Sequence, residues 1–298
     1  MRDPWHVGER ALQDRLGVAE RMAELGPRVI RDFMPEQHRE FFAELSFVLL
    51  ASVDDRGDAW AGVLVGEPGS LASSPDPRTL ALAGRPDADD PVGAGLRPGA
   101  AIGLLGIELD TRRRNRMNGT IRELGERGLT IAVEQSFGNC PKYIHPRGAS
   151  RVEGWRPGPV ERFVGLDARA RESIAAADTS FVASYFEAPG GVRRQVDVSH
   201  RGGPAGFVRV EADTLTIPDY AGNRFFNTLG NIAVQPKVGL LFIDFASGDL
   251  LQVTGDAALI FAGDPRLAGL AGAERAWTLR VRLGVRRANA IPLRWVSA

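Results

Sequence analysis

The sequence predicts a mainly β protein with short helices, made of two tandem β units that are each a barrel or a sandwich. Short apolar runs separated by Asp-, Gly- and Pro-rich turns fill two stretches of the chain, which is typical of such folds. Similar landmarks recur in the same order in both stretches. The expected organisation is an N-terminal helical extension, a first β unit, a helical linker and a second β unit, over residues 1–45, 46–150, 151–177 and 178–298.

Composition and charge limit the class of protein. The 298 residues are 44% hydrophobic, which is enough for a sizeable core. The 37 basic residues balance the 37 acidic ones, which argues against a surface tuned to nucleic acid, because such domains usually carry a basic excess. The single cysteine cannot form an internal disulfide, and the sequence has neither a signal-peptide pattern nor an apolar run of membrane-spanning length. We therefore expect a cytoplasmic protein of bacterial type with no membrane or nucleic-acid partner.

Periodicity assigns the elements in order. Near-helical spacing predicts one helix from Glu9 to about Leu25 and a second from Pro35 to Leu45. The region from Arg151 to Ala177 is rich in Arg, Glu and Ala, and Pro157 to Glu161 suits a helix start. Short apolar or alternating runs predict the strands of the first unit: Phe47 to Val53, Trp60 to Val65, Thr79 to Leu82, Ala101 to Ile107, Arg114 to Ile121 and Leu129 to Val133.

The two β units align at a nearly constant offset. Four runs of the first unit align with four runs of the second: FVLLAS with FVASYF, RTLAL with DTLTI, IGLLGIELD with VGLLFIDFA, and RMNGTI with QVTGDA. Because several landmarks at one offset are hard to produce by chance, the sequence predicts a tandem duplication. The landmark pairs are 134 to 136 residues apart: Phe47 and Phe181, Pro68 and Pro204, Thr79 and Thr214, Gly103 and Gly239, and Gly119 and Gly255.

Two motif runs carry a family resemblance. The second unit contains TLTIPDYAGNRFFNTLGNIAVQPKVGLLFIDF followed by DLLQVTGDA, and the first unit ends with IAVEQSFGNCPKYI. Together they resemble the pyridoxamine 5'-phosphate oxidase-like, FMN-binding split-barrel superfamily over most of Phe41 to Trp295. The resemblance implies six-stranded split barrels that usually pair as homodimers with flavin in the groove between them. It therefore implies two tandem split β-barrels that form a pseudo-dimer within this chain.

The two units differ where this family binds its cofactor. The second unit has Gly222 to Arg224 where the first has RPDADD, whose carboxylates repel a phosphate. The first has Asn139 to Lys142 where the second has RRANAIP. A symmetric dimer has two equivalent interface sites, and a fused pair is free to lose one of them. We therefore expect one flavin site per chain, between the halves.

The second unit supplies two groups of candidate cofactor-binding residues. The stretch from Gly222 to Asn231 is typical of a turn leading into a short helix, whose first N–H groups favour an anion, although a polar helix start without function is an alternative. The candidate cation for the phosphate is Arg224, and the candidate neutral donors are Asn223, Asn227 and Thr228. The second group is Ser199, His200 and Arg201. Gly202 and Gly203, which follow it, allow the backbone to approach a flat ring closely, although a lone histidine is more often structural.

An arginine-rich run, TRRRNRMNG, spans Thr111 to Gly119. Because side chains alternate along a strand, one face is expected to carry Arg112, Arg114, Arg116 and Asn118, and the other Arg113 and Asn115. Three interpretations are open: a solvated edge strand, a nucleic-acid contact, or donors aimed at a flavin or an anionic substrate. The flavin interpretation assigns Arg114, Arg116 and Asn118 to the cofactor site. The strand pattern of the resembled family favours this role most for Arg116 and Asn118.

The end of the first unit supplies the remaining candidates. Loops at strand ends carry function more often than cores do, and the cofactor-binding candidates here are Gln135, Ser136, Asn139, Cys140 and Lys142. Lys142 suits a cation near the flavin. A nucleophilic Cys140 is not favoured, because only His145 lies close in sequence to activate it. Four histidines and one cysteine give no metal-ligand spacing.

The resemblance implies an FMN-dependent oxidoreductase in which the flavin carries the redox chemistry. Its expected partners are a small-molecule substrate and NAD(P)H or a separate reductase, and its expected state is a monomeric pseudo-dimer or a homodimer. No catalytic residue is assigned. A flavin-binding sensor or storage protein without turnover is an alternative, and a nucleic-acid-binding regulator is a third.

Overall fold

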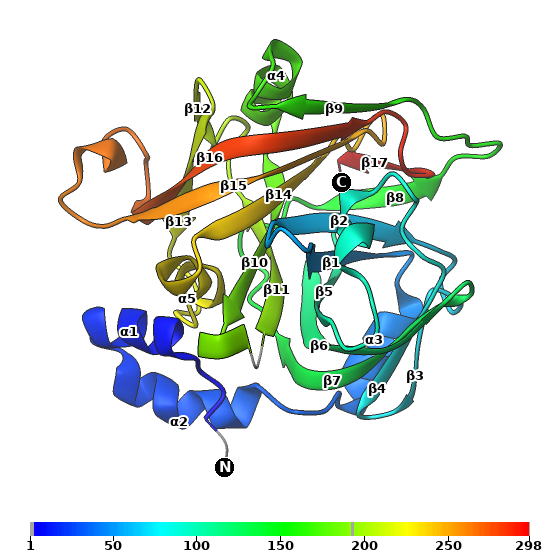
Figure 1. Ribbon diagram of the computed structural model, residues 1–298, viewed down its shortest axis with the longest axis horizontal. Helices are drawn as coiled ribbons and strands as arrows, with labels where there is room; N and C mark the ends of the chain where they lie inside the picture. The colour runs from blue at the N-terminus through cyan, green and yellow to red at the C-terminus, as the bar shows by residue number, and fades with distance from the viewer. Residues whose placement is uncertain (1–2, 192–193, 298) are drawn as a thin grey trace.

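The computed structural model describes residues 3–191 and 194–297 and is mainly β, with short helices (Figure 1). Two large antiparallel sheets dominate it, a seven-stranded one and an eight-stranded one. Three helices precede the first sheet, and a small two-stranded sheet joins the region between the halves to the C-terminal strand. The mainly β class expected from the sequence is therefore confirmed.

The N-terminal extension contains three helices where two were expected. The prediction of a single helix from Glu9 to Leu25 is wrong, because the chain turns at Gly17, whose φ of 65° lies in the left-handed region that ends helices. The second expected helix is present within one residue at each end. The helices are α1 (Val7–Arg15), α2 (Ala19–Val29) and α3 (Glu36–Glu44).

The first sheet contains every strand expected before residue 150 and one more. Its order is β2-β1-β5-β6-β7-β4-β3, and a 3-10 turn, η1 (Pro91–Gly95), connects β4 to β5. The unexpected strand is β3, which is mostly exposed and lacks an apolar run. Arg112 lies in a turn (φ 57°), outside the strand face on which it was expected. The strands are β1 (Phe47–Val53), β2 (Ala59–Val65), β3 (Ala72–Asp76), β4 (Thr79–Ala83), β5 (Ala101–Glu108), β6 (Arg113–Gly125) and β7 (Gly128–Gly138).

The expected helical linker is only partly helical. The prediction of a helix start at Pro157 to Glu161 is wrong: this segment leads into β9 (Val160–Val164), which pairs with β16 and packs Phe163 against Gly284. The helix begins later, at α4 (Ala168–Ala176), where the Asp167 side chain accepts a hydrogen bond from the N–H of Ala170. The small sheet pairs β8 (Arg147–Arg151) with β17 (Leu293–Ser297).

The second sheet repeats the strand order of the first. Its order is β11-β10-β14-β15-β16-β13-β12, and each strand number is nine higher than that of its counterpart in the first sheet. Helix α5 (Asn227–Val234) takes the place of η1 between β13 and β14. The strands are β10 (Thr179–Glu187), β11 (Arg194–Gly202), β12 (Arg209–Glu211), β13 (Thr214–Tyr220), β14 (Lys237–Ile243), β15 (Leu250–Ile260) and β16 (Ala273–Arg287).

Strand register is also repeated. Gly103 pairs with Asn118 between β5 and β6, and Gly239 pairs with Thr254 between β14 and β15. The ladder between β6 and β7 shifts register directly after Asn118, and the ladder between β15 and β16 shifts directly after Thr254. The two sheets therefore carry the same bulge at the same place, which agrees with the expected alignment of Gly119 with Gly255.

One expected landmark pair is wrong by two residues. Leu49 pairs with Leu105, and Phe181 pairs with Leu241. Because Leu105 and Leu241 occupy equivalent positions, the counterpart of Phe181 is Leu49 and not Phe47. A shift of two residues returns each side chain to the same face of a strand, so the apolar pattern alone did not reveal it.

The halves pack through mirrored backbone contacts. Strand β5 lies against β11, and β14 lies against β2. A Cβ added at Gly103 would lie 2.8 Å from the carbonyl oxygen of Val196, and one added at Gly239 would lie 2.3 Å from that of Ala59. Two equivalent glycines thus let each sheet approach the edge of the other.

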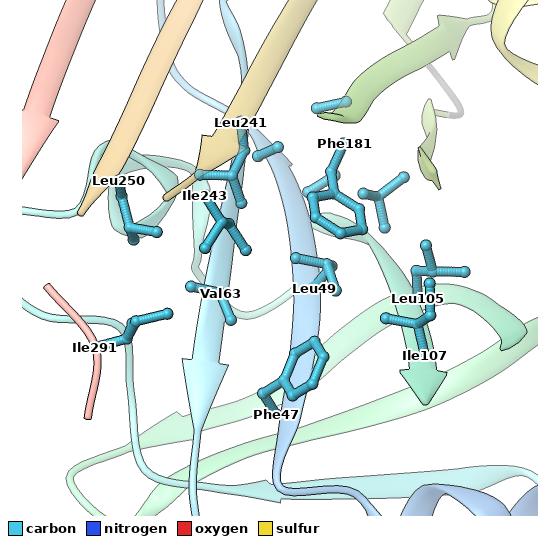
Figure 2. Packing of buried hydrophobic residues seen from close by; sticks show 14 of the residues in the cluster. Phe47, Leu49, Val63, Leu105, Ile107, Phe181, Leu241, Ile243, Leu250 and Ile291 are labelled. Carbon is cyan, nitrogen blue, oxygen red and sulfur yellow. The ribbon is translucent and has the colours of Figure 1, made fainter. Parts of the chain in front are cut away.

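A shared apolar core fills the interface between the halves. Figure 2 shows side chains from both halves that converge on it. The buried aromatic and aliphatic side chains interdigitate there, so neither half can expose this face without a large loss of burial. The labelled contributors are Phe47, Leu49, Val63, Leu105 and Ile107 from the first half, and Phe181, Leu241, Ile243, Leu250 and Ile291 from the second.

The Gly239→Ala variant tests the close approach. The added Cβ would collide with the backbone of β2, so we expect the free energy of unfolding to fall by about 1–3 kcal/mol. Denaturant unfolding measures it. Gly125→Ala is the matched control, because a Cβ there meets no atom within 4 Å among the described residues. Equal stability of the two variants would contradict this packing.

Candidate anion-binding site

An open cleft of about 110 Å³ lies between the two halves. Strand β6 supplies its wall from the first half, together with the loop after β7, and the second half supplies β11, the end of β13 and the start of α5. The structure brings most of the expected site residues to this cleft: Arg114, Arg116, Asn139, Cys140, Lys142, Ser199, His200, Arg201, Asn223, Arg224, Asn227 and Thr228.

Arg114 is the most unusual of these residues. Its Nη1 donates to Nδ1 of His200 at 3.1 Å, while its Nε is buried without a partner. Among the described residues, no carboxylate lies within 4.0 Å of its guanidinium. Burial, followed by repulsion from Arg116 and Arg201, lowers the pKa of Arg114 to about 10. A cation in this setting is costly unless an anion joins it.

The donors around Arg114 outnumber their acceptors. Burial, and then the charges of Arg114 and Arg201, hold the pKa of His200 well below its usual range, so this ring is neutral. Its Nδ1 accepts from Arg114, which leaves a proton on Nε2. In the described part of the chain, His200 Nε2, Arg201 Nε and Asn139 Nδ2 are buried nitrogens without a hydrogen-bond partner. Unsatisfied donors beside an unneutralised arginine are what an anionic ligand requires.

Arg116 is satisfied by the protein itself. Its Nη1 lies 2.9 Å from a carboxylate oxygen of Asp197 and 2.8 Å from Oδ1 of Asn227, and its Nη2 donates to Oγ of Ser199 at 2.6 Å. The hydroxyl of Thr228 donates to the same Ser199 oxygen at 3.0 Å. This network joins β6 of the first half to β11 and α5 of the second, and it forms the floor of the cleft.

The turn before α5 has strained backbone at the rim of the cleft. Arg224 has a φ of 62° and Phe226 a φ of 63°, both in the left-handed region that non-glycine residues rarely adopt. The Asn223 side chain accepts a hydrogen bond from the N–H of Phe225 at 3.1 Å, which stabilises the turn. The Arg224 side chain is 44% exposed and lies only loosely, at 3.9 Å, from Glu274. The expected turn and short helix are confirmed.

The loop after β7 forms the opposite rim. Tyr143 has a φ of 65°, stacks on Tyr220 with ring centroids 5.2 Å apart, and donates its hydroxyl proton to the carbonyl oxygen of Ala221 at 3.1 Å. Lys142 and Cys140 precede it along the same rim. Both halves therefore build the mouth of the cleft, and an aromatic pair bridges them.

Three expected site residues lie elsewhere. Asn118 is buried behind the floor, where its Nδ2 donates to Gln135 and Asp197. Gln135 lines a second, larger cleft of about 1490 Å³ beside the N-terminal segment. Ser136 does not line this cleft: its Oγ lies 2.8 Å from Nδ1 of His38, and its backbone bonds to Arg31 of the N-terminal region. Ser136 pairs with Met117, on the strand face opposite to the one that carries Arg116.

Sequence reasoning missed three carboxylates near the site. Asp197 pairs with Arg116, Asp219 pairs with Arg275, and Glu9 bonds to Asn227 from the N-terminal helix. Asp197 and Asp219 lie in strands whose alternation marks them only as inward-facing polar residues. Glu9 has no local signal, because its partner is 218 residues away.

The equivalent cleft on the other side of the interface is filled. Strand pairing makes Arg287 the counterpart of Asn139 and Gln252 that of Arg116. Arg287 donates to Asp90 at 2.8 Å and also to Asp87, while Gln252 donates to Asp90 at 2.8 Å. The carboxylates of the first half thus pair with an arginine of the second at this position.

The structure was compared with known proteins. No family model matches the chain, and no curated protein matches it. Solved structures with partial likeness include HupZ from Group A Streptococcus (15% identity, 40% of this chain and 92% of that chain, TM-score 0.31), a FAD-binding protein from Mesorhizobium loti (13%, 43% and 98%, 0.29) and the FAD binding protein from Mycobacterium smegmatis (12%, 42% and 98%, 0.29). TM-scores this low do not establish a shared function.

The described ranges, residues 3–191 and 194–297, contain neither a metal-binding cluster nor a membrane-spanning helix. No group of three or more His, Cys, Asp or Glu side chains there is arranged to hold a metal ion. No helix in the same ranges has the length and apolar character needed to cross a membrane.

Replacing Arg287 with Met tests the filled cleft. The substitution leaves Asp90 buried without its cation, so we expect the free energy of unfolding to fall by about 3–5 kcal/mol in a urea titration. Arg280→Met removes an exposed pair with Asp256 and is the control, with an expected loss of about 0–1 kcal/mol. Similar losses in both variants would mean that the Arg287 pair is not structural.

Proposed function

We propose that this chain is a flavin-dependent oxidoreductase that holds one FMN molecule between its two halves. The observation that carries the proposal is the half-buried, unneutralised Arg114, whose Nε is buried without a partner, at the wall of a cleft that both halves build. The motif runs that resemble the FMN-binding split-barrel superfamily supply the turn before α5 and the loop after β7, which form the two rims. An anionic nucleotide end suits this arrangement of donors.

The proposal includes a duplicated architecture. Both sheets have the same strand order, the same bulge and mirrored glycine contacts across the interface. These features support two tandem split barrels that form a pseudo-dimer, the single-chain equivalent of a two-fold homodimer. Among the described residues, the cleft at Arg114 is open, whereas Arg287 pairs with Asp90 at the equivalent position, which supports a single cofactor site per chain.

The residues of the cleft divide into roles. We assign the phosphate to the free donors of Arg114, His200 and Arg201 and to the rim at Asn223 and Arg224. The free donors gather at one end of the open cleft, so only the phosphate end is assigned to them. A bound flavin would supply the hydride or electron chemistry. The protein would bind and orient it, and the neutral His200 Nε2–H would donate a hydrogen bond without adding charge.

Two arginines of the run, Arg114 and Arg116, point to a small anion and not to nucleic acid. Arg116 is buried by its network, and Arg114 faces the interior of the interface. A nucleic-acid contact needs guanidinium groups on an accessible face. We therefore keep the proposal of a small-molecule substrate, with NAD(P)H or a separate reductase as the electron donor.

Stoichiometry tests the single site. We expect purified protein saturated with FMN to hold one flavin per chain, measured from the absorbance and mass of the released cofactor. Two flavins per chain would contradict the filled cleft. Anaerobic mixing of the flavin-loaded protein with NADPH and NADH then tests turnover: bleaching and reoxidation support an oxidoreductase, and their absence with a range of donors supports a sensor or storage protein.

The Arg114→Met variant tests the phosphate assignment. Losing a charge-assisted contact should weaken FMN binding about 10- to 100-fold, while riboflavin, which lacks the phosphate, should bind both proteins alike. Arg113→Met is the matched control, because Arg113 is exposed on the other face of the strand. Flavin fluorescence titration measures each affinity. Equal losses for FMN and riboflavin would refute the assignment.

A further inference from the structure

The N-terminal segment contacts the candidate site directly. Helix α1 packs on α5, as Figure 1 shows at the lower left. A Cβ at Gly8 would lie 2.1 Å from the carbonyl oxygen of Gly230, so the two helices touch backbone to backbone. Trp5 anchors the segment by donating its indole N–H to the carbonyl oxygen of Met22, and His6 stacks on Phe186.

Glu9 closes a capping box at the start of α1. Nδ1 of His6 accepts from the N–H of Gly8, and a carboxylate oxygen of Glu9 accepts from the N–H of His6 at 2.9 Å. A capping-box glutamate can serve this purpose in full contact with solvent. Glu9 is instead only 4% exposed, so capping alone does not account for its placement.

A hydrogen-bond relay connects Glu9 to the floor of the cleft. Nδ2 of Asn227 donates to Glu9 at 2.5 Å, and Oδ1 of Asn227 accepts from Arg116 at 2.8 Å. Arg116 in turn donates to Ser199 and pairs with Asp197. Asn227 is the first residue of α5, so Glu9 fixes both the amide of this side chain and the helix start that lines the cleft.

We propose that Glu9 is a positioning residue of the cleft, which through Asn227 orients Arg116 and the first turn of α5 for an anionic ligand. The N-terminal segment is then part of the ligand site. The identity of the anion rests on the proposed function, but the positioning role does not.

The local charges make this role sensitive to pH. One cation, Arg116, lies between two carboxyl groups, those of Glu9 and Asp197. Burial raises the pKa of Glu9 to about 8, opposed by hydrogen bonds from the His6 backbone and Asn227. An anion in the cleft adds another negative charge and favours the protonated form of Glu9 further. Anion binding is therefore expected to take up a proton above pH 7 and to weaken as the pH rises through 8.

The groups that surround Glu9 come from α1, β6, β11 and α5. His6 is the titratable neighbour on α1, and burial lowers its pKa to about 4, so it stays neutral. Arg116 from β6 and Asp197 from β11 are the charged groups that act on Glu9, and α5 presents the neutral Asn227 and Asn231. The second ionisation of a phosphate monoester is nearly complete above pH 7.

The test compares affinities for FMN from pH 7 to pH 9 in Glu9→Gln, Glu9→Ala and the unsubstituted chain. Cys140→Ser is present in all proteins, because this thiol lines the cleft. We expect FMN affinity to fall about three- to tenfold over this range with Glu9 present, and to be flat with Gln, which cannot ionise. Glu9→Ala should lower affinity about tenfold at pH 7 by freeing Asn227. Glu24→Gln, on an exposed part of α2, is the control and should keep the pH profile.

Two outcomes overturn the positioning role. One is that FMN affinity changes with pH in the same way in the protein with Glu9 and in Glu9→Gln. The other is that Glu9→Ala, shown to be folded by its melting temperature, binds FMN with unchanged affinity. If FMN binds none of the proteins, the proposed function fails, and the same series is read with inorganic phosphate by ³¹P NMR. The same pattern with phosphate supports the positioning role, and no phosphate binding rejects it.

Discussion

The structure depends on the backbone contact that Gly103 and Gly239 permit between the two sheets. Each glycine lets a central strand of one half lie against an edge strand of the other at a distance that any side chain would prevent. The shared apolar core forms around these contacts. The same approach brings β6 against β11, and therefore places the arginines of one half among the polar groups of the other. The cleft is a product of the interface and belongs to neither half alone.

Much of the fold could be predicted from the sequence, because apolar alternation reports directly on which face of a strand is buried. It failed where the pattern was weak or degenerate. β3 carries almost no apolar signal, β9 reads as helix by composition, and Phe47 aligned with Phe181 because a two-residue slip keeps the same face. Gly17 broke a helix that periodicity alone continued.

The candidate site was predictable where residues follow one another along a strand or turn. The expected groups around Arg114, Ser199 and Asn223 do meet in one cleft. Ser136 lies away from the cleft because it pairs with Met117, on the strand face opposite to Arg116, and its side chain meets His38 there. Glu9 was missed because its burial arises from contacts made by a distant helix. Long-range partners of this kind leave no periodic trace in the chain.

The bond between Glu9 and Asn227 has a consequence for the order of assembly. It closes a loop of 218 residues, so α1 leaves the ribosome long before the helix on which it docks. The first sheet can form while α1 has no docking surface, and the Leu12 side chain, which packs into the core of the second half, is then still exposed. Docking of α1 therefore belongs among the final steps of folding, and the cleft acquires its floor only when synthesis of the second sheet is far advanced.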